Sequence, residues 1–315
     1  MADTDVIQPD ASGIARAGDL LANGRLVAFP TETVYGLGAD AQNDRAVAAI
    51  YEAKGRPSFN PLIVHVPDLD TARDLAVFTD KAEVLAKAFW PGALTLVLPL
   101  KPDSGISKLV TAGHDTVAIR VPAHDTARAL LRAAGRPLAA PSANPSGRIS
   151  PTIAEHVMQG LSGRIAAVLD GGPCSVGVES TILDAGEPVR LLRPGGIPRE
   201  SIQELVGEVQ EAALSETAPN APGQLASHYA PAAVVRLNAV TRLADEVFLG
   251  FGGTEGATMD LSPSGDLLEA AANLFGMLHR LDAMGKPIAV APIPETGLGH
   301  AINDRLRRAA APRGQ

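Results

Sequence analysis

Short apolar runs alternate with amphipathic segments along the first two thirds of the chain. In residues 44–54, Val47, Ile50 and Tyr51 recur at the spacing of one helix face, which predicts an amphipathic helix. Residues 62–66 and 94–98 are short and mostly apolar, which is typical of buried strands. The same criteria predict strands at 26–29, 117–121, 138–140, 166–169, 180–183 and 189–192, and helices at 71–77, 80–89, 126–134 and 152–159. This alternation predicts an α/β fold in which helices cover a twisted mixed sheet. It does not predict the order of the strands in that sheet.

The composition changes between residues 208 and 232, where alanine, proline, serine, asparagine and glycine predominate. Such a stretch is typical of a semi-extended linker. Beyond it, the pattern predicts strands at 233–237, 246–251 and 288–292 and helices at 267–284 and 300–310. We therefore expect a first domain at 1–207, a linker at 208–232 that can close over a site, and a small α/β domain at 233–315.

The charge and cysteine content exclude some classes of protein. The formal net charge is −8, from 27 Lys+Arg and 35 Asp+Glu, which does not suit a dedicated nucleic-acid binder. The single cysteine, Cys174, excludes an intramolecular disulfide and a cysteine-rich zinc site. No His/Glu spacing on the predicted helices indicates a dedicated metal site. The polar, acidic first ten residues and the lack of a membrane-length apolar run predict a soluble cytoplasmic protein.

Candidate chemistry begins where the strand at 26–29 ends. Pro30 is followed by Thr31, Glu32 and Thr33, and then by a turn predicted at Gly36 and Gly38. A buried strand that leads into a polar, glycine-bearing loop places hydroxyls and backbone N–H groups around a ligand. An ordinary strand-to-turn corner explains this segment equally well.

Further motifs follow in a fixed order along the chain. They are Lys54-Gly55-Arg56-Pro57, Asn60-Pro61-Leu62, Pro141-Ser142-Ala143-Asn144, Glu179-Ser180-Thr181 and His228-Tyr229-Ala230-Pro231. Each motif is weak alone, but together they resemble the YrdC-like family of threonylcarbamoyl-AMP synthases in its long, two-domain form. The resemblance implies a YrdC-like catalytic domain, a linker and a small Rossmann-like α/β domain.

The resemblance also implies an activity and site residues. The family joins L-threonine, bicarbonate and ATP into threonylcarbamoyl-AMP and pyrophosphate, with Mg²⁺ carried by the phosphates. A separate transferase then uses the product to modify adenosine next to the anticodon of tRNA. The implied ATP-binding residues are Arg56, Asn60, Thr116, Ser142, Ser150, Arg193 and Tyr229. The implied threonine-binding residues are Thr33, His65, Arg120, Ala140 and Ser180, and the implied catalytic residues are Lys54, Arg56, Ser142 and Asn144.

The cations have a structural interpretation beside the functional one. Lys54 and Arg56 stand at a helix end, where a positive charge caps the helix dipole. Gly55 and Pro57 break the chain there, however, which we expect to expose both side chains as a phosphate site. Arg120 ends an apolar strand, so it predicts either a buried salt bridge or a clamp for the α-carboxylate of an amino acid.

The polar residues carry similar alternatives. His65, on an apolar strand, is either a core residue or a contact of threonine. Ser142 and Asn144 lie among turn formers, and we expect their side chains to point outward from a stiff loop. Ser150 is expected to open the helix at 152–159 as its N-cap, and a helix start is also an anion site. Tyr229 either pins the linker or contacts the nucleotide.

No activated nucleophile or paired acid and base is visible, which agrees with a reaction that depends on positioning and charge stabilisation. Two other classes of function remain as alternatives, an RNA-binding module and a non-catalytic nucleotide sensor. Net acidity and 3% aromatic residues disfavour stable nucleic-acid binding. Mixing the protein with ATP, threonine and bicarbonate and analysing the products separates these alternatives.

Overall fold

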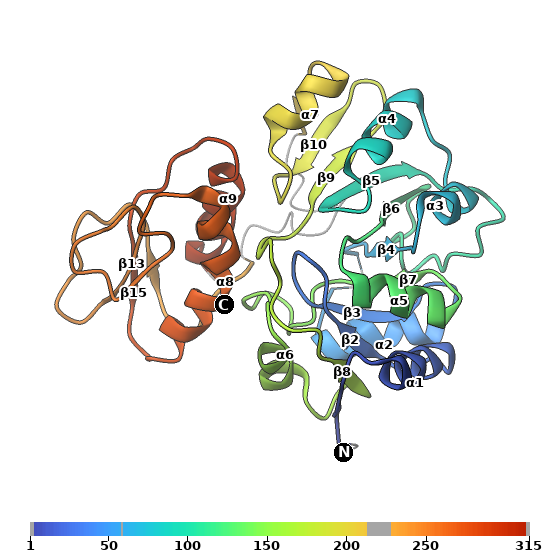
Figure 1. The fold of residues 1–315 in the computed structure, drawn as a ribbon, viewed down its shortest axis with the longest axis horizontal. Helices are drawn as coiled ribbons and strands as arrows, with labels where there is room; N and C mark the ends of the chain where they lie inside the picture. Colours follow the sequence, from blue (N-terminus) through green and yellow to red (C-terminus); the bar gives the residue numbers. More distant parts are fainter. Residues whose placement is uncertain (1–2, 58, 213–227, 313–315) are drawn as a thin grey trace.

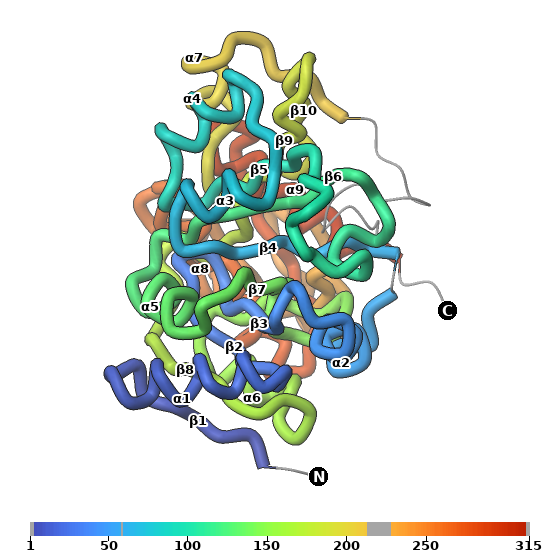
Figure 2. Tube along the Cα trace, turned by 90° about the vertical axis from the view of Figure 1, so that its right-hand side faces the viewer, coloured from blue at the N-terminus to red at the C-terminus, as the bar shows by residue number. Residues whose placement is uncertain are grey.

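The computed structural model describes residues 3–57, 59–212 and 228–312. The strands in this part of the chain form an eleven-stranded sheet and a separate four-stranded sheet. Figure 1 shows the two sheets in separate domains, with helices α8 (Leu267–Asp282) and α9 (Gly299–Ala310) of the smaller domain facing the larger one. In Figure 2, turned by 90°, the smaller domain lies behind the larger one. The predicted α/β architecture is confirmed.

The large sheet is mixed, as the sequence predicts. In spatial order its strands are β1 (Asp5–Ile7), β8 (Ala167–Leu169), β2 (Val27–Phe29), β3 (Gly36–Asp40), β7 (Leu138–Ala139), β4 (Ile63–His65), β6 (Thr116–Arg120), β5 (Leu94–Pro99), β9 (Thr181–Asp184), β10 (Arg190–Arg193) and β11 (Gln210–Glu211). The neighbours β4 and β6 run parallel, and their register pairs His65 with Arg120. The carboxyl ends of these strands therefore bring two predicted site residues together.

Helices cover both faces of this sheet. They are α1 (Ala11–Ala22), α2 (Asp44–Lys54), α3 (Leu69–Leu75), α4 (Asp80–Phe89), α5 (Asp125–Ala134), α6 (Ala154–Leu161) and α7 (Arg199–Val206). The helix predicted at 44–54 has the same bounds as α2, which begins behind the N-cap Asn43 and ends at the left-handed Gly55. Helix α1 packs closely on α5, since a Cβ at Gly18 would lie 3.1 Å from Ala133.

The turn predicted at Gly36 and Gly38 is wrong, because these residues form strand β3, antiparallel to β2. A Cβ at Gly38 would lie 2.9 Å from the Phe29 ring, so glycine here gives room for an aromatic side chain of the neighbouring strand. Besides β3, the elements without a predicted counterpart are β1, α1, α7, β11 and β14 (Met259–Asp260).

The smaller domain is built on a parallel sheet in the order β12 (Val235–Arg236), β15 (Ile288–Val290), β13 (Val247–Gly250) and β14 (Met259–Asp260). Its core also contains residues of the larger domain, because Val34, Ile149 and Val178 join one apolar cluster with Leu274 and Phe275 of α8. The two domains thus share a buried contact.

The first domain extends further along the chain than the predicted boundary at residue 207. Strand β11 pairs with β10, so the sheet of the larger domain continues beyond the predicted end at 207. Of the predicted linker at 208–232, residues 213–227 lie outside the described part of the chain. Among the described helices, none is long and apolar enough to cross a membrane.

Candidate active site

One cavity collects most of the predicted site residues. It opens beside the carboxyl ends of β4 and β6 and the start of β9. The predicted residues in its wall are Thr33, Arg56, His65, Arg120, Ala140, Ser142, Ser180, Arg193 and Tyr229. Other lining residues are Thr31, Val34, Gly36, Ile63, Pro141, Glu179 and His228. Residues predicted to bind ATP and residues predicted to bind threonine thus line the same cavity.

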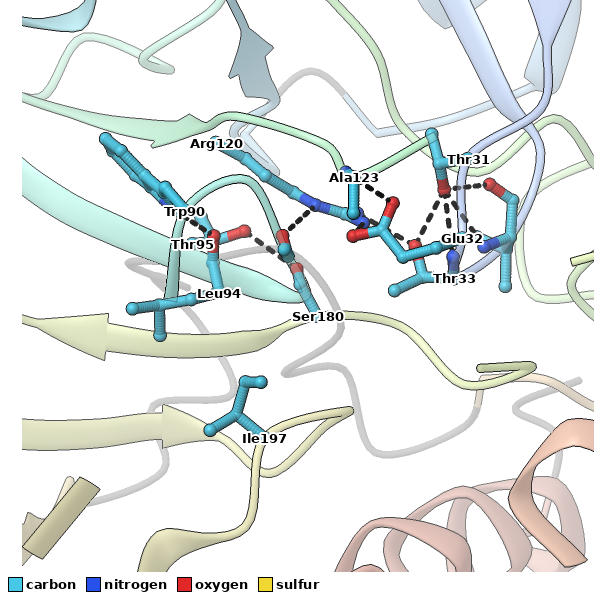
Figure 3. A network of polar contacts seen from close by, with 12 residues as sticks. Thr31, Glu32, Thr33, Trp90, Leu94, Thr95, Arg120, Ala123, Ser180 and Ile197 are labelled. Carbon is cyan, nitrogen blue, oxygen red and sulfur yellow. Dashed lines mark hydrogen bonds and ion pairs between the residues drawn. The ribbon is translucent and has the colours of Figure 1, made fainter. Parts of the chain in front are cut away.

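Arg120 is buried, and contacts with other residues of the protein hold its side chain in place. Its Nη2 lies 2.7 Å from Glu32 Oε1, its Nη1 donates to Thr33 Oγ1 at 2.8 Å and its Nε donates to the Gly92 carbonyl at 3.2 Å. Figure 3 shows Arg120 reaching toward Glu32 and Thr33, and Glu32 in turn accepting from the Ala123 N–H. The structural salt bridge is therefore present.

A guanidinium carries five N–H groups. Nε and Nη1 of Arg120 each donate one hydrogen bond, whereas the contact of Nη2 with Glu32 is a close ion pair without hydrogen-bond geometry. Both terminal nitrogens of Arg120 therefore keep N–H groups that no hydrogen bond uses. The salt bridge is therefore compatible with a carboxylate clamp.

His65 lies next to Arg120 and is 3% exposed. Its Nδ1 donates to the Ile63 carbonyl at 3.2 Å, because a carbonyl can only accept, and this leaves Nε2 as an acceptor. Burial, with a smaller contribution from the Arg120 charge, lowers the pKa of His65 to about 3. His65 is therefore neutral near pH 7, and the structure shows it as both a packed core residue and a lining residue.

Ser180 connects the two predicted halves of the site. Its Oγ lies 2.7 Å from Thr95 Oγ1, and Arg193 Nη2 donates to the Ser180 carbonyl at 2.9 Å and to Ser180 Oγ at 3.3 Å. Ser180, which is predicted to bind threonine, thus accepts hydrogen bonds from Arg193, which is predicted to bind ATP. We expect the two substrates to meet at this contact.

The prediction that Lys54 and Arg56 are exposed is wrong, since they are 3% and 8% exposed. Arg56 Nε donates to the Asn60 carbonyl at 3.3 Å, and its Nη2 donates to the Pro61 carbonyl at 3.0 Å. Burial lowers the pKa of Arg56 to about 10, so the side chain stays charged at pH 7. The carbonyls hold the guanidinium in the cavity wall.

Asn60, whose carbonyl accepts from Arg56, is fully buried. Neither polar atom of its side chain has a hydrogen-bond partner within the described residues. It does not line the cavity. A buried amide without partners is costly, so Asn60 offers donors and an acceptor next to the predicted phosphate site.

Lys54 supports the loop at 141–147. Its Nζ donates to the Ser142 carbonyl at 2.6 Å and also to the Asn144 carbonyl, and its own carbonyl accepts from the Ser146 N–H at 2.8 Å. It does not cap its own helix and does not line the cavity. Its contacts present Ser142, which does line the cavity.

Asn144 turns inward, contrary to the expected outward orientation. It is 3% exposed, and its Nδ2 donates to the carbonyls of Pro145 at 3.0 Å and Arg148 at 2.8 Å. It thereby stiffens the loop instead of lining the cavity. The catalytic roles predicted for Lys54 and Asn144 stay predictions.

Ser150 and Thr116 lie away from the cavity wall. Helix α6 begins at Ala154 behind Ile153, so the prediction that Ser150 is its N-cap is wrong. Ser150 Oγ instead donates to Glu179 Oε1 at 2.5 Å, because a buried carboxylate oxygen competes better for the hydroxyl. Thr116 is exposed at the far end of β6 from Arg120. Their predicted contacts with ATP stay predictions.

Tyr229 is 1% exposed and lines the cavity next to His228. Its backbone is left-handed, with φ of 61°, which is unusual for a bulky residue. The next residue is tied to the larger domain, because the Ala230 N–H donates to the Gly147 carbonyl at 2.8 Å. Ala230 therefore anchors the described end of the linker segment, and Tyr229 beside it forms part of the cavity wall.

Family models match nearly the whole chain. Residues 19–195 match the model described as "Telomere recombination", and residues 197–311 match the "Threonylcarbamoyl-AMP synthase, C-terminal domain". The threonylcarbamoyl-AMP synthase of Bacillus subtilis is 45% identical over 98% of this chain and 96% of its own. The chain belongs to the threonylcarbamoyl-AMP synthase family. It has the long, two-domain form that its motifs resemble.

Other relatives support the same assignment. The threonylcarbamoyl-AMP synthase of Pyrococcus abyssi is 43% identical over 93% of each chain. The crystal structure of P. abyssi Sua5 complexed with L-threonine superposes with a TM-score of 0.91 at 40% identity, covering 98% of each chain. E. coli YciO, at 22% identity and a TM-score of 0.56, shares the fold over 62% of this chain.

Glu179 and His228 line the cavity of this synthase-family chain, although neither has a predicted role. Both residues belong to motifs that carry the family resemblance, and this position in the sequence could have indicated that they line the site. Burial alone would raise the pKa of Glu179, but Arg305 and Arg193 outweigh it, and the pKa is lowered. Glu179 is therefore an anion in a wall rich in arginine.

The described residues contain no hydrogen bond between a serine or threonine hydroxyl and a histidine. Burial raises the pKa of Cys174 to about 12, which keeps this thiol protonated. No group of three or more His, Cys, Asp or Glu suited to a metal ion occurs within the described ranges. The lining residues therefore offer fixed cations and hydroxyls instead of a nucleophile.

Proposed function

We propose that this chain is a nucleotidyltransferase that joins L-threonine, bicarbonate and ATP into threonylcarbamoyl-AMP and pyrophosphate. The observation that supports it most is one cavity in which Arg120, Arg56 and Arg193 stand around Ser142 and Ser180. The likeness to P. abyssi Sua5 complexed with L-threonine, over 98% of each chain, supports the amino-acid substrate.

The reaction takes two steps. The threonine amine attacks the carbon of bicarbonate, and a carbamate forms with loss of water. A carbamate oxygen then attacks the α-phosphorus of ATP, the bond to the bridging oxygen breaks, and pyrophosphate leaves with the electron pair. Neither step needs a nucleophile from the protein, so catalysis depends on orientation and on stabilising negative charge.

The lining residues divide these tasks. The free N–H groups of Arg120 bind the threonine carboxylate, and Nε2 of neutral His65 accepts a hydrogen bond from the substrate. Arg56 and Arg193 lie against the phosphates, where they offset the charge that develops on the α-phosphoryl group. Lys54 and Asn144 shape the loop that brings Ser142 to ATP.

Mg²⁺ enters this site as part of the nucleotide substrate. Glu179 is a lining carboxylate, but Ser150 and Arg305 occupy its two oxygens. The ion is then held chiefly by phosphate oxygens and water, which suits its preference for few protein ligands.

The product is a mixed anhydride that reacts readily with nucleophiles. We propose that a separate transferase in the cytoplasm consumes it to modify adenosine next to the anticodon of tRNA. The formal net charge of −8 gives no support to stable nucleic-acid binding by this chain itself.

Product analysis tests the proposal. The protein is mixed with ATP, L-threonine and bicarbonate, and each component is omitted in turn. We expect threonylcarbamoyl-AMP and pyrophosphate only in the complete mixture. Release of ADP and orthophosphate would overturn the synthase assignment, and ATP binding without any product would favour the nucleotide sensor.

A further inference from the structure

The C-terminal domain supplies a buried arginine to the back of the active site. Arg305 lies on α9 and is fully buried. Its Nε donates to Glu179 Oε2 at 2.7 Å, and its Nη1 donates to the Pro194 carbonyl at 2.9 Å and to Asp304 Oδ2 at 2.8 Å. One guanidinium thus bridges the two domains.

The same guanidinium lies over the ring of Tyr229. Its central carbon is 5.1 Å from the ring centroid, within the range of a cation–π interaction. Phe275 of α8 contacts the same ring, at 5.6 Å between centroids. The aromatic ring of Tyr229 is therefore packed by two side chains of the C-terminal domain.

Tyr229 needs such support because its backbone is strained. A bulky residue at φ of 61° is unfavourable by roughly 1 kcal/mol or more and persists only where its surroundings hold it. Strain of this kind concentrates at functional sites. Tyr229 and Glu179 both line the cavity, whereas Arg305 does not.

The charge of Arg305 is balanced before any ligand binds. Glu179 and Asp304 lie against it on two sides, with N–O distances of 2.7 and 2.8 Å. Arg305 thus contributes contacts to the two lining residues and little net positive charge. This separates its role from that of Arg56 and Arg193, which line the cavity themselves.

We propose that Arg305 is a positioning residue through which the C-terminal domain completes the nucleotide side of the active site. It fixes the Tyr229 ring by a cation–π contact and fixes the Glu179 carboxylate by a charged hydrogen bond. The nucleotide assignment of this side rests on the proposed function. The packing of Tyr229 by Arg305 does not.

Tyrosine nitration followed by mass spectrometry tests the packing in the ligand-free, full-length protein. The chain has three tyrosines, and the buried Tyr35 and Tyr51 are internal standards because they lie in the larger domain. We expect Arg305→Lys to raise nitration of Tyr229 about tenfold, since lysine keeps the charge but loses the planar fork that Glu179 and the Pro194 carbonyl hold over the ring. Arg307→Lys, an exposed position on the same helix, is the matched control and should leave the pattern unchanged.

Steady-state kinetics of the same variants tests the consequence for the reaction. Arg305→Lys should raise the KM for ATP about tenfold and the KM for threonine by less than about threefold, because the Arg120 side of the cavity is unchanged. Arg307→Lys should leave both constants unchanged. A purely structural role of Arg305 would instead lower the melting temperature without this split between substrates.

A second variant keeps the test valid if Arg305→Lys fails to fold. Arg305→Gln removes the charge and the guanidinium plane but keeps an amide that can donate to Glu179, and it should reproduce the rise in nitration and the ATP-selective effect. If Tyr229 stays as protected as in the parent protein in the folded variants, Arg305 is not its positioning residue. A parent protein that makes no threonylcarbamoyl-AMP would reject the proposed function, whereas the nitration result would still decide the packing claim.

Discussion

At the residue scale, the cations of the site are held in place before substrate binds. Arg120 is fixed by Glu32 and Thr33, and Arg56 is fixed by backbone carbonyls. Groups that are already oriented need little rearrangement when charge develops in the transition state. The sequence showed that Arg120, at the end of an apolar strand, required a partner. It did not show that the partner was Glu32, because the two residues lie 88 positions apart in the sequence.

Arg56→Ala should weaken ATP binding by roughly 1.5–3 kcal/mol, the range for a hydrogen bond to a charged group. Threonine binding should change much less, because the proposed function assigns Arg56 to the phosphates. Isothermal titration calorimetry with each substrate measures both effects. Arg45→Ala changes an exposed arginine at the start of α2, the helix that ends just before Arg56, and this control should bind both ligands normally.

Arg120→Lys should show the reverse selectivity. Lysine still offers a charge to the buried Glu32 but lacks the two-pronged donor geometry, so the Kd for threonine should rise about tenfold with little change for ATP. Calorimetry of Arg120→Lys beside Arg56→Ala measures the split. If both substitutions weaken the same ligand, the division of the cavity is wrong.

At the element scale, two stacked histidines join the domains. His156 of α6 and His279 of α8 have ring centroids 3.8 Å apart at 18°. His156 Nδ1 accepts from the Thr152 N–H, and His279 Nε2 donates to the Ser150 carbonyl. Burial, followed by the neighbouring His279, lowers the pKa of His156 to about 4, and burial also lowers the pKa of His279.

The stability of the protein should therefore fall as the pH is lowered from about 6.5 toward 4. Above pH of about 6.5 both the folded and unfolded states hold these histidines neutral. Below it, the unfolded state takes up protons that the folded state does not, so the free energy of unfolding decreases. Urea unfolding at pH 7, 6 and 5 measures this slope.

His279→Gln should make that slope shallower, because the amide can still donate to Ser150 but does not titrate in this range. His300→Gln, at a half-exposed histidine of the same domain, is the control. An unchanged slope in His279→Gln would show that the histidine pair does not contribute to the pH dependence.

The elements themselves were predictable to different degrees. Helices with clear periodicity and caps, such as those at 44–54 and 80–89, have the predicted bounds. The sequence predicts a turn at the glycine-rich β3, because its strand conformation depends on pairing with β2 and β7 instead of local propensity. It predicts an N-cap at Ser150, because the competing carboxylate of Glu179 is distant in sequence.

At the scale of the whole molecule, the site is completed by contacts between domains. The sequence predicted two domains and a linker, and the family resemblance supplied the site residues. Strand order and the Arg305–Glu179 ion pair were not predictable, because both depend on long-range packing. Gly177 shows how close this packing is, since a Cβ there would lie 2.4 Å from the Ala271 carbonyl oxygen.

A chain ending at Ala212 should fold but with a lower free energy of unfolding. The main apolar cluster of the larger domain contains no residue from the C-terminal domain, whereas Glu179 would lose Arg305. An unpaired carboxylate at this site destabilises by roughly 3–5 kcal/mol if it stays buried. Urea unfolding measures the loss, and adding Glu179→Gln to the shortened chain should recover part of it. No recovery would mean that the ion pair is not what couples the domains.

The most direct test of the account follows the oxygen atoms of bicarbonate through the reaction. Bicarbonate labelled with heavy oxygen is mixed with ATP, L-threonine and the protein, and the products are analysed by mass spectrometry at short times. If a carbamate oxygen attacks the α-phosphorus, the label is found in threonylcarbamoyl-AMP and the pyrophosphate carries none. Labelled orthophosphate released with ADP would show that bicarbonate attacks the γ-phosphate instead, and this would contradict the proposed arrangement of substrates in the cavity.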